Sequence, residues 1–143
     1  MAEADPFVTS ALTVLTGVLV FVLGQIVLEF YIKPIKRQDE LIVEITDALI
    51  YYADIWANPG FASDEIIIDA SGNLRKLSSQ LRAVSNSIRG YSWFASRNIV
   101  ISYNNLNKIT ENLIGLSNSL GKNGTLERNE KLVQEIREAL NMG

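Results

Sequence analysis

The sequence predicts an all-α protein with one N-terminal transmembrane helix followed by a small cytoplasmic antiparallel bundle of about four helices. Two observations predict this fold class. A long uncharged apolar segment lies near the N-terminus, and apolar residues recur at helical spacing through the rest of the chain. After the span, roughly a hundred residues remain, which is enough for one small domain. We therefore expect a short extracytoplasmic N-terminus (1–6), a transmembrane helix (7–32) and a cytoplasmic helical domain (33–143).

The composition argues against several classes of function. The chain has no Cys and no His, so thiol nucleophiles, zinc sites built from these residues and imidazole acid–base catalysis are absent. The net charge of -3 makes nucleic acid an unexpected partner, because phosphate contacts need an excess of Lys and Arg. The sequence also lacks a Gly-rich phosphate loop, a nucleophile elbow and the ligand spacing of a calcium loop. We expect no enzymatic activity, no catalytic residue, no cofactor and no metal.

The predicted anchor is the segment from Pro6 through Leu28, which contains no charged residue. As a helix, the run from Phe7 to Leu28 rises about 33 Å, enough to cross a hydrocarbon core of ~30 Å. A signal peptide would begin with basic residues and end at a cleavage site, whereas this run leads into Glu29 and Phe30. We therefore expect an uncleaved, single-pass anchor.

The flanking charges predict an orientation. Glu3 and Asp5 precede the span, whereas Lys33, Lys36 and Arg37 directly follow it. Basic residues are retained on the cytoplasmic side of a membrane. We therefore expect a protein of the plasma (inner) membrane, with its N-terminus outside and its C-terminal domain in the cytoplasm.

A stripe of small residues runs along the predicted span. Ser10, Gly17 and Gly24 recur every seven residues, and Thr13 lies four residues before Gly17. Small side chains let two membrane helices approach closely, and the amide of Gln25 would gain from a partner in lipid. These five residues are the candidates for association between spans. The alternative is that they are simply the residue types common in membrane helices.

Four amphipathic helices are predicted beyond Pro34, where we expect either a kink or the start of a new helix. Gly72 is a weak point within the second of them, because glycine costs about 1 kcal/mol relative to alanine. The segment 91–101 is ambiguous, and we favour a turn and a helix start there. The first helix should end at 58–60, the second should run from Ser63 or Asp64 to a turn at 89–91, the third should span about 102–120, and the fourth should begin at Thr125.

Charge is segregated along the chain. Positions 38–74 carry eight acidic residues and no basic one, whereas 70–110 carry six basic residues and no acidic one. One interpretation is that an acidic helix lies antiparallel to a basic one and forms ion pairs worth ~0.2–1 kcal/mol each. The other is that arginines bind an anionic partner such as phospholipid headgroups or a nucleotide. The candidate anion-binding residues are Arg75, Arg82, Arg89 and Arg97, and the aromatic residues Tyr91, Trp93, Phe94 and Tyr103 among them belong either to an interface or to the core.

The segments GQIVLEFYIKPIK, LIYYADIWANP, LRKLSSQLRA and LIGLSNSL resemble small single-span bacterial membrane proteins of unknown function. The resemblance covers most of the chain. It implies an N-terminal anchor, a helical domain and a source in a bacterium or phage. It implies no activity and no site residue.

Three functions fit these observations. The leading hypothesis is a non-enzymatic, membrane-anchored helical interaction protein that self-associates or docks partners at the cytoplasmic face of a bacterial inner membrane. One alternative is a ligand-gated membrane effector of the defence type, which senses an anionic molecule such as a nucleotide. The other is an accessory single-span subunit of a larger membrane complex. The expected partners are the lipid bilayer and either further copies of the chain or a larger membrane complex.

Overall fold

The computed structural model describes residues 5–141, and every regular element within that range is a helix. The all-α prediction is therefore confirmed, and the ambiguous segment 91–101 forms a short helix and a turn. Glu3 and the other residues at 1–4, part of the predicted N-terminal flank, lie outside the described range. The elements are α1 (Pro6–Val27), the π-helical turn η1 (Leu28–Ile32), α2 (Lys33–Tyr51), α3 (Ala53–Ala57), α4 (Asp64–Ser87), α5 (Tyr91–Ala95), α6 (Tyr103–Asn118) and α7 (Leu126–Asn141).

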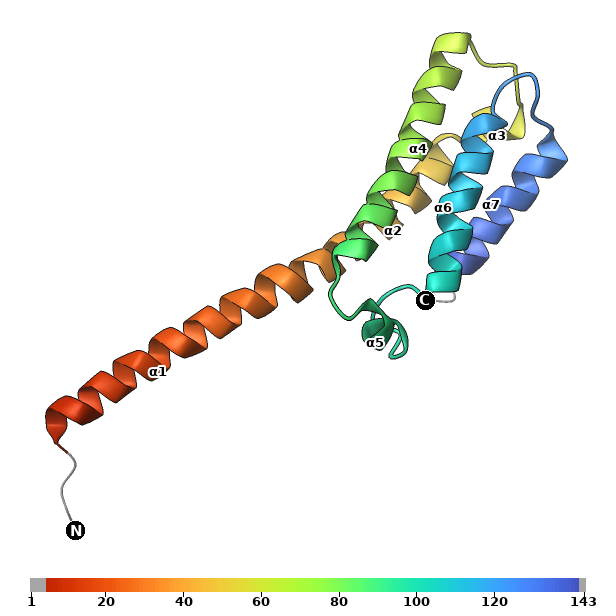
Figure 1. Ribbon diagram of the computed structural model, residues 1–143. Coiled ribbons are helices and arrows are strands. Elements are labelled where there is room, and N and C mark those ends of the chain that lie inside the picture. The colour runs from red at the N-terminus through yellow and green to blue at the C-terminus, as the bar shows by residue number, and fades with distance from the viewer. Residues whose placement is uncertain (1–4, 142–143) are drawn as a thin grey trace.

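One continuous helix of 46 residues runs from Pro6 to Tyr51 and comprises α1, η1 and α2 (Figure 1). The Asp5 carboxylate caps its start by accepting a hydrogen bond of 2.9 Å from the Phe7 amide, which satisfies one of the free amides of the first turn. Because α1, η1 and α2 form one helix, the chain passes from the apolar segment into the packed helices with no linker.

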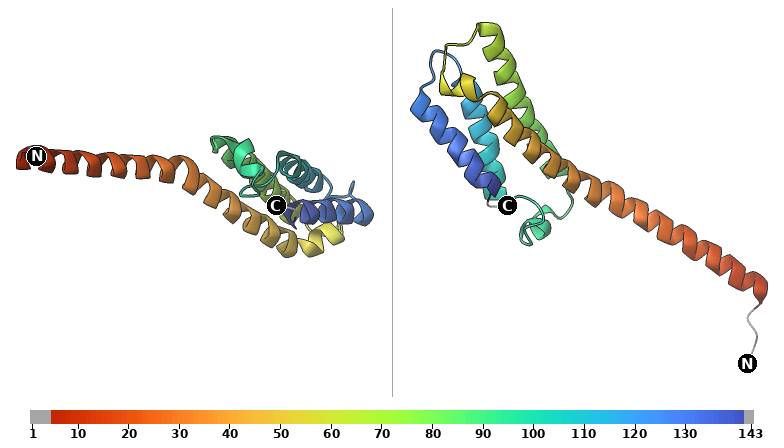
Figure 2. Two further views of the ribbon diagram at one scale, coloured as in Figure 1. Left: turned by 90° about the horizontal axis from the view of Figure 1, so that it is seen from below. Right: turned by 180° about the vertical axis from the view of Figure 1, so that it is seen from behind.

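Pro34 does not end this helix. Proline has no amide hydrogen and its ring crowds the preceding turn, so a helix must adjust around it. The adjustment is the wider turn η1 directly before it, where the Lys33 amide donates to the Leu28 carbonyl. The left-hand view of Figure 2 shows the helix bending in this region. Of the two outcomes predicted at Pro34, a bend is observed and a new helix is not.

The α1 helix is long and apolar enough to cross a membrane, and none of its residues is buried against the rest of the chain. Phe7 is 79% exposed and Phe21 is 66% exposed. A helix that is apolar on all sides would normally lie in a protein core or in lipid. Because α1 projects away from the other helices (Figure 1), no part of the described chain covers it.

The packed helices are α2, α4, α6 and α7, and they share one hydrophobic core. The α4 helix packs against both α2 and α6, and α6 also packs against α7. Burial of each large apolar side chain stabilises the fold by about 1.5–3 kcal/mol. The fully buried side chains include Leu41, Ile45 and Leu49 from α2, Leu74 and Leu81 from α4, Leu106, Ile109, Leu113 and Leu116 from α6, and Ile136 from α7.

The first predicted helix differs in one detail from the expected pattern, and the predicted weak point at Gly72 does not break the second helix. The first predicted helix is interrupted at Tyr52, and the short helix α3 continues it to Ala57, directly before the predicted stop. The Trp56 indole holds this corner by donating to the Leu49 carbonyl at 2.8 Å. Gly72 does not interrupt the second helix, since α4 runs unbroken through it. The side chains on both sides of this glycine keep α4 packed against its neighbours.

The two turns at the end of the packed helices far from α1 contact each other. The Gly60 amide donates to the Leu120 carbonyl at 3.0 Å. The buried Asn129 amide donates to the Trp56 carbonyl at 2.8 Å and accepts from the Ser119 hydroxyl. These bonds join α3, the end of α6 and the start of α7, so that end of the molecule is fixed by polar contacts as well as by apolar packing.

Candidate interaction surfaces

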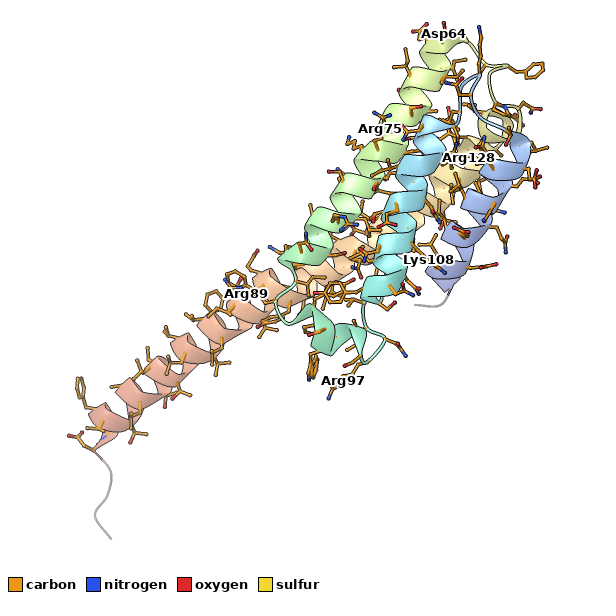
Figure 3. The ribbon with its side chains drawn as sticks, turned by 45° about the vertical axis from the view of Figure 1, so that its right-hand side comes forward. Asp64, Arg75, Arg89, Arg97, Lys108 and Arg128 are labelled. Carbon is orange, nitrogen blue, oxygen red and sulfur yellow. The ribbon has the colours of Figure 1, made fainter. Side chains whose placement is uncertain are left out.

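The four candidate anion-binding arginines do not form one site. Arg75, Arg82 and Arg89 lie seven residues apart. Because α4 ends at Ser87, only Arg75 and Arg82 lie on this helix, where they share one side. The four arginines also contact different parts of the structure. Arg75 and Arg82 lie against α6, whereas Arg89 lies against the end of the apolar helix and Arg97 lies beyond α5 (Figure 3).

Arg75 and Arg82 line a groove of about 440 Å³ between α4 and α6. The Arg75 guanidinium donates to the Ser117 hydroxyl at 3.1 Å and to the Asn118 side-chain oxygen at 2.5 Å. The Arg82 guanidinium donates to the Thr110 hydroxyl at 2.7 Å. Both arginines are exposed, and their hydrogen-bond partners on α6 are neutral. The groove therefore combines two positive charges with hydroxyl and amide groups.

The predicted ion pairs between the acidic and basic segments are not formed. Within residues 5–141, the ion pairs join Lys33 to Glu29 and Arg37 to Glu40 and Glu44, all on the continuous helix. The expectation fails because Arg75 and Arg82 of α4 hydrogen-bond to residues of α6. The carboxylates of α2 lie on the exposed side of α2. No carboxylate in residues 5–141 therefore pairs with Arg75 or Arg82.

Arg89 and Arg97 stack on aromatic rings near the end of the apolar helix. The Arg89 guanidinium carbon lies 4.5 Å from the centre of the Phe30 ring, and that of Arg97 lies 3.9 Å from the Trp93 ring. Cation–π contacts of this kind are attractive and leave the outer edge of the guanidinium free for other partners. Figure 3 shows both arginines at the end of the packed helices nearest to α1 and Asp64 at the opposite end.

A buried polar cluster joins the continuous helix to the α5 region. The fully buried Gln38 donates to the Ser85 hydroxyl at 2.7 Å and to the Tyr91 hydroxyl at 3.0 Å, and its carbonyl oxygen accepts from the Ile101 amide at 3.1 Å. The Tyr91 hydroxyl donates to the Ile101 carbonyl at 2.7 Å. Burial raises the pKa of the Tyr91 phenol, which keeps it protonated and able to donate.

Sequence reasoning missed Gln38, because it directly follows a group of basic residues and is itself polar. A signal was nevertheless present. Gln38 lies three residues before Leu41 and seven before Ile45, so it occupies a position on the buried stripe of α2. A polar residue at a core position predicts a buried hydrogen-bond cluster.

The candidates for association between spans all lie on the exposed α1 helix. There is open space beside Gly17 and Gly24. The hydroxyls of Ser10 and Thr13 donate to carbonyls of their own helix at 2.8 and 2.9 Å, which leaves them without unsatisfied donors. The Gln25 amide makes no side-chain hydrogen bond with any residue in 5–141. The structure thus leaves this side of the helix uncovered.

The described chain is all-helical and has one helix long and apolar enough to cross a membrane. Its surface carries the groove lined by Arg75 and Arg82. A second pair of arginines, Arg89 and Arg97, stacks on aromatic rings near the end of the apolar helix. Within the described residues, no group of three or more acidic side chains is placed to hold a metal ion. Comparison with known protein families, curated proteins and solved structures finds no match to this chain.

Proposed function

We propose that this protein is a non-enzymatic, membrane-anchored interaction protein of a bacterial inner membrane, with its helical domain in the cytoplasm. The observation that carries the proposal is the continuous helix from Pro6 to Tyr51. One half of it is apolar and uncovered, and the other half supplies the first helix of the packed core. A helix shared in this way holds the domain at a set orientation to the bilayer.

The Gln38 cluster supports the same proposal. Gln38 lies within two turns of η1 and is hydrogen-bonded to Ser85 near the end of α4 and to the Ile101 amide just before α6. Rotation of the packed helices about the helix axis would break these buried hydrogen bonds, which are costly to leave unpaired. A rigid connection suits a protein that presents a surface at a fixed height above the membrane.

The proposed orientation rests on Lys33, Lys36 and Arg37. Lys33 and Arg37 are paired with carboxylates on the same helix. The pairing does not weaken the argument, because basic residues near the end of a span set its orientation and acidic residues contribute little.

Self-association through α1 is the first interaction to test. The full chain, labelled at an introduced Ser63→Cys, would be reconstituted in vesicles, and association would be measured by energy transfer between copies. We expect Gly17→Val to weaken association at least several-fold, because a branched side chain would separate two closely packed helices. Ala11→Val is the matched control, since Ala11 lies outside the stripe. A wild-type chain that is strictly monomeric in vesicles and copurifies with no other protein would overturn the proposal.

A second candidate function is favoured by the groove between α4 and α6. Arg75 and Arg82 pair with no carboxylate in residues 5–141, and such arginines suit a phosphate-bearing ligand. The continuous helix would connect the ligand-binding domain to the membrane span. Calorimetry on the full chain in lipid nanodiscs, with ATP as the probe, tests this ligand-gated effector. We expect Arg75→Gln with Arg82→Gln to abolish binding and Lys108→Gln to preserve it. Absence of binding, together with an unchanged membrane potential on overexpression, would exclude this candidate.

Copurification with a larger membrane protein would instead support the third function, an accessory single-span subunit of a larger membrane complex.

A further inference from the structure

The turn at 88–101, which includes α5 and which we call the α5 turn, lies beside the end of the apolar helix. The Phe94 ring centre is 5.9 Å from that of Tyr31, and the Arg89 guanidinium carbon is 4.5 Å from the Phe30 ring. Phe30 and Tyr31 closely follow Leu28, the last residue of the uncharged segment. If α1 crosses the bilayer, these contacts place the α5 turn at the depth of the lipid headgroups. Figures 1 and 2 both show α5 on the α1 side of the packed helices.

The exposed side chains of the α5 turn suit a membrane surface. Trp93 is 52% exposed and Ile99 is 45% exposed, although both are apolar and belong to a short connection between helices. Tryptophan is enriched at the level of the headgroups, where its ring is partly in lipid and its N–H remains hydrated. Arg97 stacks on Trp93 at 3.9 Å, so the indole and a positive charge are presented together.

The α5 turn is held in one shape by its own hydrogen bonds and by the buried cluster. The Tyr91 side chain anchors it from inside through Gln38 and the Ile101 carbonyl. Asn98 adopts a positive φ of 55°, and the Ile99 amide then donates to the Phe94 carbonyl at 3.0 Å, which closes the turn. A surface already fixed in its binding shape loses little conformational freedom on contact.

Charge selects the kind of lipid. The segment 70–110 contains no acidic residue, and neither Arg89 nor Arg97 pairs with a carboxylate in residues 5–141. Basic groups close to the cytoplasmic leaflet are attracted by anionic headgroups. We propose that the α5 turn is a second membrane contact, in which Trp93 and Ile99 enter the headgroup region and Arg89 and Arg97 bind anionic phospholipids. This inference rests on the proposed membrane anchoring.

Fluorescence quenching tests the contact, because the chain contains two tryptophans that lie at opposite ends of the packed helices. Trp93 belongs to α5, and Trp56 belongs to α3 at the far end (Figure 1). The full chain would be reconstituted in vesicles of phosphatidylcholine and phosphatidylglycerol with acyl chains brominated near the headgroup. We expect strong quenching of Trp93 in the Trp56→Phe variant and little quenching of Trp56 in the Trp93→Phe control. Equal and weak quenching of both would overturn the inference.

The role of charge is tested in the Trp56→Phe background. We expect quenching of Trp93 to increase with the phosphatidylglycerol fraction, and Arg89→Gln with Arg97→Gln to remove most of that increase. The matched control is Lys108→Gln with Arg128→Gln, which removes two positive charges elsewhere and should leave the increase unchanged. Quenching that is independent of phosphatidylglycerol, or equally sensitive to both pairs, would overturn the assignment of these arginines.

Flotation of the same samples after carbonate extraction separates this inference from the proposed anchoring. A chain that floats with the vesicles while Trp93 stays unquenched would overturn the α5 contact and leave the anchor in place. A chain that is extracted by carbonate would overturn the anchor itself. Circular dichroism of each variant confirms that loss of quenching does not reflect loss of helix.

Discussion

The side-chain amide of Gln38 lies fully buried although it follows a basic stretch of the chain. All of its hydrogen-bonding groups point to partners that arrive from distant parts of the sequence, namely Ser85, Tyr91 and the Ile101 amide. A buried polar group is tolerated when it is fully paired and is costly when it is not. Gln38 therefore favours one arrangement of the continuous helix against the α5 turn.

Gln38→Ala should destabilise the protein by about 2–4 kcal/mol, because it leaves the buried Ile101 amide unpaired and creates a cavity. Gln134→Ala is the control, since Gln134 is exposed and bonds only to Glu138 on its own helix, and its effect should stay below about 0.5 kcal/mol. Denaturant unfolding of the full chain in detergent, followed by circular dichroism, measures both. Similar losses for the two variants would contradict the structural role of Gln38.

Gly124 and Gly121 lie in the same turn but differ in the space around them. A Cβ atom at Gly124 would lie 1.6 Å from the Ser119 carbonyl oxygen, whereas one at Gly121 would meet nothing within 4 Å. Gly124→Ala should therefore cost at least about 2 kcal/mol, because a rigid backbone atom would have to move. Gly121→Ala should change stability by less than about 1 kcal/mol. Thermal unfolding measures both variants, and equal losses of stability would contradict the close approach of Gly124 to the Ser119 carbonyl.

At the scale of elements, α4 shows how packing overrides a local weakness. Gly72 lies within a helix that continues from Asp64 to Ser87. The buried residues Leu74, Leu77 and Leu81 that follow it contact the neighbouring helices, and this burial outweighs the lower helix propensity of a single glycine. The π-helical turn before Pro34 is a comparable case, in which the helix adjusts locally and continues.

Gly72→Ala should raise stability by about 0.5–1 kcal/mol, since alanine restricts the unfolded chain and the position is open in the folded one. The reciprocal change Ala83→Gly, at another exposed position of α4, should lower stability by a similar amount. The thermal midpoints of both variants measure these effects. Destabilisation by Gly72→Ala would contradict the open space at this position.

At the scale of the whole molecule, the continuous helix determines how the parts relate. Because α1 and α2 are parts of one helix, the packed helices have a set direction relative to the apolar segment. The bend at η1 and the contacts of Phe30 and Tyr31 bring the α5 turn beside the end of that segment. The arginine groove faces another part of the surface, so the molecule presents two separate basic sites.

The orientation can be tested with single cysteines, because the chain has none of its own. A membrane-impermeant maleimide should label Asp5→Cys in intact spheroplasts and should label Ser63→Cys only after lysis, since basic residues follow the span. Asp5 caps the start of α1 and Ser63 precedes α4, whose start lies at the opposite end of the molecule (Figure 1), and both residues are exposed. The reverse labelling pattern would place the helical domain outside the cytoplasm.

Much of the fold could be predicted because its causes are local. The uncharged segment specifies the apolar helix, the spacing of Leu74, Leu77 and Leu81 specifies α4, and the Asn58–Pro59–Gly60 turn ends α3. Each of these depends on residues that are neighbours in the sequence. The site was predicted less well. The four arginines were identified as candidates, but their division into two pairs was not.

The sequence by itself therefore determined that this protein is all-helical and that one helix is apolar enough to cross a membrane. Only the tertiary structure decided that Gln38 is a core residue, that Arg75 and Arg82 face α6 and that the α5 turn lies beside Phe30 and Tyr31. The physical reason is that helical periodicity specifies which residues share a face. Which faces meet depends on the packing of helices that are distant in the sequence.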